Sequence, residues 1–505
     1  MGSHGRFAGM VFRPGCRVAV SAFALSTLTL FTSGCGGGST SSNSGSATGP
    51  VAGESTTVAI QLSSTANDEF VHFNMTIDQI SLTNQEGKTT TIFSTPTGVD
   101  FIPANGNSIP FATVSVPQDV YTSAAISVSN PSFSYISMDP QGGIYISTDA
   151  YGYTPTPPVV NLTGPITISG SAMALKVDLQ ASQSGSYSGA PPNQTAYTIN
   201  PTFQLSSFAI PAKPTSPQNG LSIGLAGQVT SIDNAGTTLT VALAGHPLAG
   251  SQSLQVALDP STVIQGVPLA SSLVPGTLID FDLALQPDAS YAATRIDVPD
   301  ATATNLNTGQ IMEIDPSYNY VMSDSTQQEG SILSDQPVGM GYPYEFGAST
   351  SFFTSARFQN LSSLPFNAVF NGSTLAPGQM VSVASTSISF TGGTWTEPTS
   401  ITLVAQTIDA LVTSVTNAGG SGYTVYTVQL APYDLIVQMN SAAGAAVNSR
   451  LANASTVNVY VNSATTVLNS TPLAAGGVFR FTGLLFNDGG VLRMVCDRVD
   501  DQVPQ

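Results

Sequence analysis

Apolar and polar residues alternate with a period of two through most of the chain. In the run 278–285, for example, Phe281 and Leu283 share one face, whereas Asp280 and Asp282 share the other. This alternation is typical of strands with one buried and one polar face, as in antiparallel sheets. Turn signals rich in Gly and Asn separate these runs, and helical periodicity is rare. The pattern therefore predicts an all-β protein.

Three landmarks recur in the same order three times in the second half of the chain. Each copy opens with a strand, continues to a Leu-x-x-Gly turn and closes on an apolar residue followed by Asp. This recurrence predicts repeated units at 222–300, 306–409 and 410–502, a size suited to small closed barrels without exposed sheet edges. The opening strands are 227–233, 309–315 and 410–416, the turns end at Gly276, Gly378 and Gly476, and the closing pairs are Ile296-Asp297, Ile408-Asp409 and Val499-Asp500.

These landmarks resemble those of a small barrel-like domain of unknown function that occurs in tandem in bacterial exported proteins. The resemblance implies a fold similar to the oligonucleotide/oligosaccharide-binding (OB) barrel. Residues 55–213 resemble a second uncharacterised lipoprotein module, of prealbumin-like sandwich type. We therefore expect an N-terminal antiparallel β-sandwich followed by three tandem OB-like β-barrels, with no activity implied by either family. The segments that carry the second resemblance are 57–60, 116–121, 175–179 and 197–201.

Residues 1–34 have the features of a bacterial signal peptide. Three arginines precede an apolar stretch, 18–31, which is too short to span a bilayer because spanning takes about 20 apolar residues. The stretch ends in Thr32-Ser33-Gly34-Cys35, which resembles the lipobox of bacterial lipoproteins except that Thr32 stands where that family prefers Leu. The resemblance implies cleavage before Cys35 and attachment of lipid to its thiol. An ordinary signal peptide cleaved near Gly34 is the alternative.

Residues 35–54 are rich in Gly, Ser and Thr, which is typical of a flexible tether. Gly36 stands where many diderm bacteria use Asp to retain lipoproteins in the inner membrane. We therefore expect a lipid-anchored, extracytoplasmic protein of the cell envelope, in the outer membrane if the organism is a diderm.

The charge balance is strongly acidic, with 30 Asp and Glu against 12 Lys and Arg and a net charge of −18. Such a surface repels phosphate backbones and anionic headgroups, so nucleic acid is an unfavourable partner. We expect the lipid anchor, rather than a basic patch, to hold the protein at the membrane.

Candidate catalytic and metal-binding groups are sparse. We expect His72 to be solvated, His246 to lie in a turn, and Cys496 to be a buried structural thiol beside Leu492 and Met494. Two separated imidazoles and one such thiol make neither a hydrolytic triad nor a zinc site. We therefore predict no catalytic residues, no metal ligands and no cofactor. Calcium stays open because hard oxygen ligands are abundant, although no EF-hand loop is present.

Carboxylate pairs support an alternative, a secreted carboxylate-dependent polysaccharide hydrolase. Asp280 and Asp282 lie about 7 Å apart by strand geometry, within the range for inverting glycoside hydrolysis. A solvated outer strand face is the favoured interpretation, because Ser382 and Arg480 occupy the positions that correspond to Asp280 in the other repeats. Surface pairing is likewise expected for the C-terminal residues Arg493, Asp497, Arg498, Asp500 and Asp501.

Four tyrosines beside Gly and Pro are the candidate ligand-binding residues. They lie on expected loops, where an aromatic ring can stack on a sugar or anchor a protein partner. The leading hypothesis is thus a non-enzymatic cell-envelope lipoprotein with a binding or structural role and a possible glycan or protein ligand. The four residues are Tyr151, Tyr153, Tyr342 and Tyr344.

Overall fold

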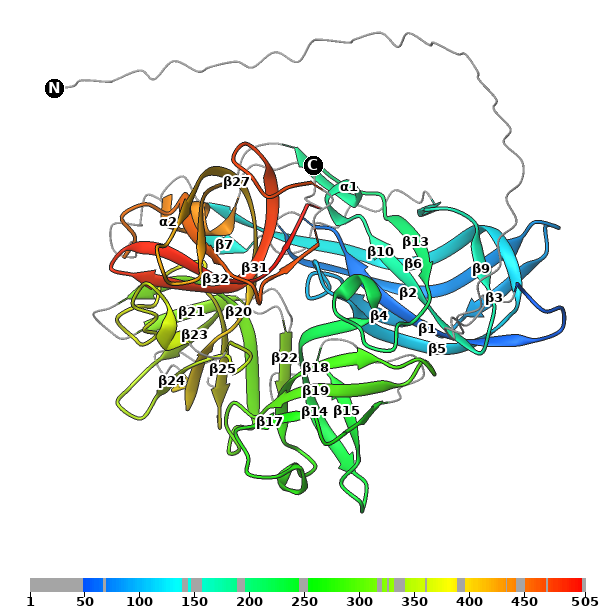
Figure 1. The fold of residues 1–505 in the computed structure, drawn as a ribbon, viewed down its shortest axis with the longest axis horizontal. Coiled ribbons are helices and arrows are strands. Elements are labelled where there is room, and N and C mark those ends of the chain that lie inside the picture. The colour runs from blue at the N-terminus through cyan, green and yellow to red at the C-terminus, as the bar shows by residue number, and fades with distance from the viewer. Residues whose placement is uncertain are drawn as a thin grey trace, which may run out of the picture. The chain divides into compact units, whose positions relative to one another are not determined.

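β-Strands make up most of the described chain in the computed structural model, so the all-β prediction is confirmed (Figure 1). Within the described part, no helix has the length and apolar character needed to cross a membrane. The description covers residues 49–501 except 67–69, 139–143, 147–156, 189–195, 245–252, 316–319, 325–326, 331–340, 359–360, 388–395, 433, 442–449 and 469–470.

The N-terminal module consists of two sheets that share one hydrophobic core, which includes Phe73, Phe133 and Leu175. The first sheet is mixed, because β1 pairs in parallel with β10 and β8 pairs in parallel with β13. Its order is β5 (Ile109–Pro117), β1 (Ser55–Ser64), β10 (Ala172–Leu179), β13 (Thr202–Phe208) and β8 (Val159–Leu162). The second sheet has the order β3 (Thr89–Phe93), β2 (Phe70–Asn84), β6 (Asp119–Met138) and β7 (Ile144–Ile146), with β4 (Thr97–Asp100) on β2 and β9 (Ile166–Ile168) on β6. A helical turn α1 (Ala181–Ser184) and a hairpin of β11 (Gly185–Ser188) and β12 (Ala196–Ile199) complete the module.

The first and third repeats each form a closed five-stranded barrel with one further short strand paired to its last strand. Parallel pairing of β16 with β19 closes the first barrel, and pairing of β29 with β32 closes the third. The first contains β14 (Leu221–Ile232), β15 (Thr238–Leu243), β16 (Leu254–Ala257), β17 (Val263–Gln265), β18 (Leu278–Leu285) and β19 (Tyr291–Asp297). The third contains β27 (Gln406–Asn417), β28 (Thr424–Leu430), α2 (Leu435–Ser441), β29 (Thr456–Val461), β30 (Thr466–Val467), β31 (Val478–Asp488) and β32 (Val491–Asp500).

The second repeat has the same central strands, but no pairing among its described residues closes it into a barrel. Its strand β26 takes the place of the closing strand, with Ile401 opposite Val383 of β25. Ile408-Asp409 belongs to β27, which pairs with β28 and β31 of the third unit. The predicted boundary after Asp409 is therefore wrong. The strands are β20 (Asn305–Asp315), β21 (Tyr320–Asp324), β22 (Gln327–Gly330), β23 (Gly341–Glu345), β24 (Ser351–Thr354), β25 (Met380–Ser385) and β26 (Ser400–Leu403).

The three repeats share one hydrogen-bond register at the Leu-x-x-Gly turn. In each unit the amide of the turn glycine donates to a carbonyl of the opening strand, and that strand carries a bulge at the same place. The turn requires a positive φ, which glycine adopts at little cost. The φ angles are +95° at Gly276, +90° at Gly378 and +88° at Gly476, and the acceptors are Val229, Ile311 and Val412 at 2.8, 2.7 and 2.8 Å.

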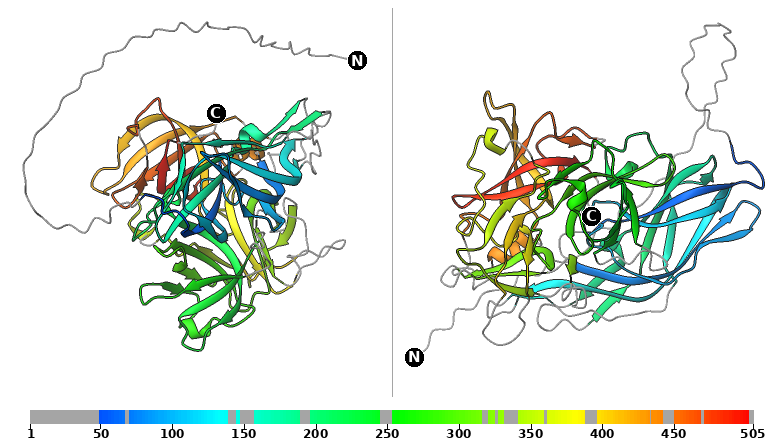
Figure 2. Two further views of the ribbon diagram at one scale, coloured as in Figure 1. Left: turned by 90° about the vertical axis from the view of Figure 1, so that its right-hand side faces the viewer. Right: turned by 90° about the horizontal axis from the view of Figure 1, so that it is seen from below.

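Shared cores join the four modules in a circuit of contacts. In Figures 1 and 2, for example, the orange and red strands of the third repeat lie beside the yellow-green strands of the second. Residues of the sandwich also enter the core of the first barrel, and a last cluster links the sandwich with the second and third repeats. The joining residues are Ala59, Ile109 and Ala174 between sandwich and first barrel; Leu278 and Leu306 between first and second repeats; Leu484 and Phe486 between second and third; and Val71, Met312 and Met439 in the last cluster.

Arg480 of β31 makes a polar joint between the third repeat and the sandwich. Its guanidinium pairs with Asp409, with Nε and Nη2 at 2.8 Å from the two carboxylate oxygens, and both side chains are 2% exposed. The same guanidinium donates to the carbonyl of Ala66 at 2.8 Å and to Oδ1 of Asn105 at 3.0 Å. The third repeat is therefore fixed to the sandwich by buried charge as well as by apolar contact.

Candidate functional site

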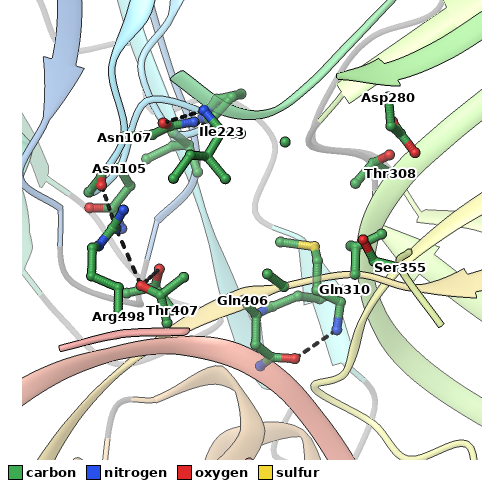
Figure 3. Close-up of a pocket in the computed structure, with 18 of the residues that line it drawn as sticks. Asn105, Asn107, Ile223, Asp280, Thr308, Gln310, Ser355, Gln406, Thr407 and Arg498 are labelled. Carbon is green, nitrogen blue, oxygen red and sulfur yellow. Dashed lines mark hydrogen bonds between the residues drawn. The ribbon is translucent and has the colours of Figure 1, made fainter. Parts of the chain in front are cut away.

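A chamber of about 210 Å³ lies where residues of all four modules meet (Figure 3). The sandwich contributes β2 and the loop after β4, and the first barrel contributes β14, β18 and β19. The second repeat contributes β20, β25 and the segment after β24, while the third contributes β27, β31, β32 and α2. The chamber thus exists only because the modules are joined in a circuit.

Two side-chain amides hold the chamber's walls together. Asn107 of the sandwich donates from Nδ2 to the carbonyl of Ile223 at 2.6 Å and accepts from the Ile223 amide at 3.0 Å. Gln406 of β27 accepts from the amide of Met380 at 2.9 Å and donates to the carbonyl of Gly378 at 3.0 Å. Each amide satisfies backbone groups of a neighbouring module, so the lining is built from paired groups.

Strand β18 places its two carboxylates on the outer face of the first barrel. Ile279, Phe281 and Leu283 point into the barrel core, so Asp280 and Asp282 point away from it. That outer face is covered by the other modules, and Asp282 is 7% exposed. The expectation of a solvated face is therefore wrong, because the outside of this barrel is an interface rather than a surface.

Asp282 is fully engaged in pairing. Arg295 of β19 donates from Nε to Asp282 Oδ2 at 3.0 Å, and the amide of Gly224 donates to Oδ1 at 2.7 Å. Burial alone raises the pKa of Asp282, but the charge and hydrogen bonds of Arg295, aided by Gly224, outweigh it and hold the pKa below its usual range. Arg295 also contacts the carboxylate of Asp297. These three charged side chains form a structural ion-pair cluster at the wall of the chamber.

Asp280 has a different environment from Asp282, which lies two residues further along the same strand. Its carboxylate lines the chamber, and no hydrogen bond or ion pair ties it to another described residue. Burial raises the pKa of Asp280 to about 6, although the charge of Arg295 opposes the rise. A carboxylic acid in a chamber with its pKa raised toward neutral pH is the kind of perturbed group that marks functional sites.

Arg498 of β32 contributes a buried cation to the other side of the chamber. It is 5% exposed, and its Nη2 donates to the carbonyl of Gly106 at 2.6 Å. Its Nε has no hydrogen-bond partner among the described residues and lies 3.8 Å from Oδ2 of Asp500. Arg357 also lines the chamber and pairs with Asp497. The buried guanidiniums thus have nearby acids but retain unused donors.

Comparison with known families gives one match. The model described as "Domain of unknown function (DUF5666)" matches residues 226–297. No curated protein matches the chain at a significant level. The DUF5666 match covers the first barrel from β14 to the end of β19, and therefore includes both Asp280 and Arg295. The expected likeness of this barrel to a domain of unknown function is confirmed, and the match assigns no activity.

The tyrosines predicted as loop residues are not brought together at this site. Tyr342 and Tyr344 lie in β23 and are 5% and 1% exposed, so their placement on exposed loops is wrong. They belong to the core shared with Phe346, and Nδ2 of Asn307 donates to the Tyr344 hydroxyl at 2.9 Å. Gly and Pro residues beside these tyrosines interrupt the alternation of apolar and polar residues, so the sequence pattern did not predict this buried strand. Cys35, Tyr151 and Tyr153 lie outside the described residues.

Two further expectations about charged residues are wrong. His72 is buried in β2 rather than solvated, with Nδ1 3.0 Å from Oδ2 of the buried Asp100. Arg498 and Asp500 are buried rather than paired at the surface. The expectation for Cys496 is confirmed, since its thiol is buried in one core with Leu492 and Met494. His246 lies outside the described residues.

The sequence contains a signal for the chamber arginines that pattern reading missed. Arg295-Ile296-Asp297 and Arg498-Val499-Asp500 place arginine at the same position of the closing strand in the first and third repeats. Arginine is scarce in this chain, so its recurrence at one landmark indicates a shared role.

Among the described residues, no group of three His, Cys, Asp or Glu side chains is placed to hold a metal ion.

Proposed function

We propose that the protein is a non-enzymatic, lipid-anchored protein of the bacterial cell envelope whose central chamber binds a small ligand. The observation that carries the binding role is the chamber itself, lined by all four modules and containing Asp280, which has no hydrogen bond or ion pair among the described residues. Apolar residues such as Phe70, Ile223 and Val404 line the same space. Apolar walls with a few convergent polar groups are typical of small-molecule sites.

The lining supports binding more strongly than hydrolysis. A polysaccharide hydrolase of the type considered above needs two carboxylates that face the substrate. Of the described residues that line the chamber, Asp280 is the one carboxylate, since Asp282 is committed to Arg295 and Gly224. The volume of about 210 Å³ also lies below the usual range of drug-sized pockets, so the proposed ligand is a small molecule rather than a polymer or a protein.

The binding role requires small molecules to reach the chamber. The methyl group of Met380, which lines it, provides an NMR signal that reports their arrival. We expect members of a library of small amphipathic compounds to shift this signal in the full exported chain, and a library without effect on Met380 contradicts the proposal.

The lipid anchor rests on the leader and on the lipobox-like residues that end at Cys35. Cys35→Ala is expected to abolish incorporation of labelled fatty acid and to move the protein from the membrane to the soluble exported fraction. The effect should be nearly complete, because anchoring by two or more acyl chains is stable whereas the protein is too acidic to bind anionic lipid by charge. Cys496→Ala is the matched control, since that thiol is buried in the third barrel. Unchanged fractionation of Cys35→Ala would remove the anchor from the account.

A further inference from the structure

One side of the chamber is formed by an acid and two hydroxyl groups. Asp280 lines the space, is only partly buried, and makes no hydrogen bond or ion pair with another described residue. Figure 3 shows Thr308 and Ser355 on the same side of the chamber as this carboxylate. A carboxylate accepts hydrogen bonds without donating any, and a hydroxyl oxygen can accept as well. This side therefore suits a ligand group with several N–H donors, such as a primary ammonium group.

The arginines that line the chamber do not make a matching site for an anion. Nη1 of Arg357 and Nε of Arg498 have no hydrogen-bond partner among the described residues, but both atoms are buried in the protein and are not open to the chamber. Each of these arginines also has at least one acid beside it. The groups are Arg295 with Asp282 and Asp297, Arg357 with Asp497, and Arg498 with Asp500.

The charge balance of the chamber favours a cation. Together with Asp280, the acids beside these arginines outnumber them, and the whole chain carries a net charge of −18. The local and the long-range electrostatic fields thus have the same sign, so both attract a cation and repel an anion. Asp280 is the acid of this group that no arginine contacts, and a bound cation would supply the counter-charge that it lacks.

Apolar side chains cover much of the remaining wall. Figure 3 shows Ile223 across the open space from Asp280, and Met380, Val404 and Leu435 also line the chamber. A hydrocarbon group gains free energy by leaving water for such walls. The volume of about 210 Å³ lies below the range of drug-sized pockets, which limits that group to a few carbon atoms.

We infer that the chamber binds a small primary amine, an alkylammonium ion whose charged end lies at Asp280 and whose hydrocarbon part occupies the apolar remainder of the space. Thr308 and Ser355 stand where their hydroxyl oxygens can accept the other ammonium hydrogens. This inference rests on the proposed binding function and specifies the class of ligand.

The test compares three compounds with one hydrocarbon skeleton and different charges. Binding of 3-methylbutylamine, 3-methylbutan-1-ol and 4-methylpentanoate to the full chain is measured by calorimetry at pH 7.5. The amine is expected to bind at least tenfold more tightly than the alcohol or the carboxylate. In Asp280→Asn the amine is expected to lose this advantage over the alcohol, because the group that receives the ammonium is neutral. Asp288→Asn is the matched control and should leave all three affinities unchanged, since Asp288 lies on an exposed turn of the same barrel and does not line the chamber.

Lowering the pH provides a second readout of the same contact. The pKa of Asp280 is raised to about 6, so the ionised acid that receives the ammonium becomes scarce at pH 5, and amine affinity should fall about tenfold between pH 7.5 and pH 5. The charged groups that face Asp280 keep their charge over this range, because Arg295, Arg357 and Arg498 do not titrate there and the pKa of Asp282 lies below its usual value. An alkylamine, with a pKa of about 10 like that of lysine, stays protonated.

The outcomes separate this inference from the proposed function. If the alcohol or the carboxylate binds as tightly as the amine, or if Asp280→Asn or pH 5 leaves the preference for the amine intact, the amine class is wrong. The same is true if the amine does not bind while other small molecules shift the Met380 signal, in which case the binding function stands with a different ligand. Because no hydrogen bond or ion pair of the described chain is lost, Asp280→Asn is expected to fold, and its circular dichroism spectrum checks that it does.

Discussion

Replacing Arg480 with Met is expected to lower the free energy of unfolding by about 3–5 kcal/mol. The substitution removes the guanidinium that pairs with Asp409 inside the protein, and both side chains are 2% exposed. Removing one partner of a buried pair is costly because the other charge stays buried without its counter-charge. It also takes hydrogen bonds from Ala66 and Asn105, so the joint between the third repeat and the sandwich weakens. Chemical denaturation of the full chain measures the effect.

Arg493→Met is the matched control for this prediction. Arg493 pairs with Asp488 at 2.7 Å, but both side chains are about one quarter exposed, at 24% and 23%. A partly exposed ion pair is worth less than a buried one, and Arg493 also contacts the Tyr460 hydroxyl and the ring of Phe366, so we expect a measurable loss that is smaller than that of Arg480→Met. Neutralising the orphaned acid in the double variant Arg480→Met with Asp409→Asn should restore part of the stability. Equal losses for Arg480→Met and Arg493→Met would contradict a buried joint between these modules.

Asp282→Asn and Asp280→Asn are expected to change stability in opposite directions, although the residues are two positions apart on one strand. Asp282→Asn should cost about 3 kcal/mol at neutral pH, because Arg295 and the amide of Gly224 lose a charged acceptor. The cost lies at the lower end of the range for a broken buried pair, since Arg295 keeps its contact with Asp297.

Asp280→Asn should instead stabilise the protein at pH 7.5. Its folded pKa of about 6 exceeds the unfolded value of 3.8, so the folded state binds the proton more tightly and ionised Asp280 costs stability above pH 6. At 1.36 kcal/mol per pKa unit the gain is at most about 3 kcal/mol. The wild-type chain recovers this difference as the pH falls from about 6 to about 4, and the two proteins should then unfold alike.

The contrast between these two acids decides whether Asp280 has a structural role. An acid that lowers stability and pairs with nothing in the described chain is typical of a functional group. If Asp280→Asn destabilised the protein as much as Asp282→Asn, Asp280 would be a structural residue and the proposed site would lose its acidic side.

The repeated units could be predicted because local sequence determines them. Alternation in 278–285 identifies the barrel core, and Gly276, Gly378 and Gly476 mark a turn that needs positive φ. The circuit of modules could not be predicted in this way. It depends on small residues such as Ala59 and Ala174, whose sequence context does not reveal whether they face a neighbouring strand or another module.

The candidate site was hidden from sequence reasoning for the same reason. Alternation shows that Asp280 points out of its barrel, but not that other modules cover that face. The prediction for Tyr342 and Tyr344 was also wrong, because adjacent Gly and Pro suggested an exposed loop where the chain forms the buried strand β23. Composition predicts local exposure well for isolated domains and poorly where domains pack on one another.

The methyl signal of Met380 tests most directly whether the chamber binds a ligand. The methionine methyl groups of the full chain are labelled with ¹³C, and Met380→Leu identifies the signal that reports the chamber. Met494, which is buried in the core of the third barrel, serves as the internal control. Binding in the chamber predicts that small amphipathic molecules shift the Met380 signal in a saturable manner while the Met494 signal stays in place. A Met380 signal that no compound shifts, or that moves only together with Met494, would contradict a ligand site in the chamber.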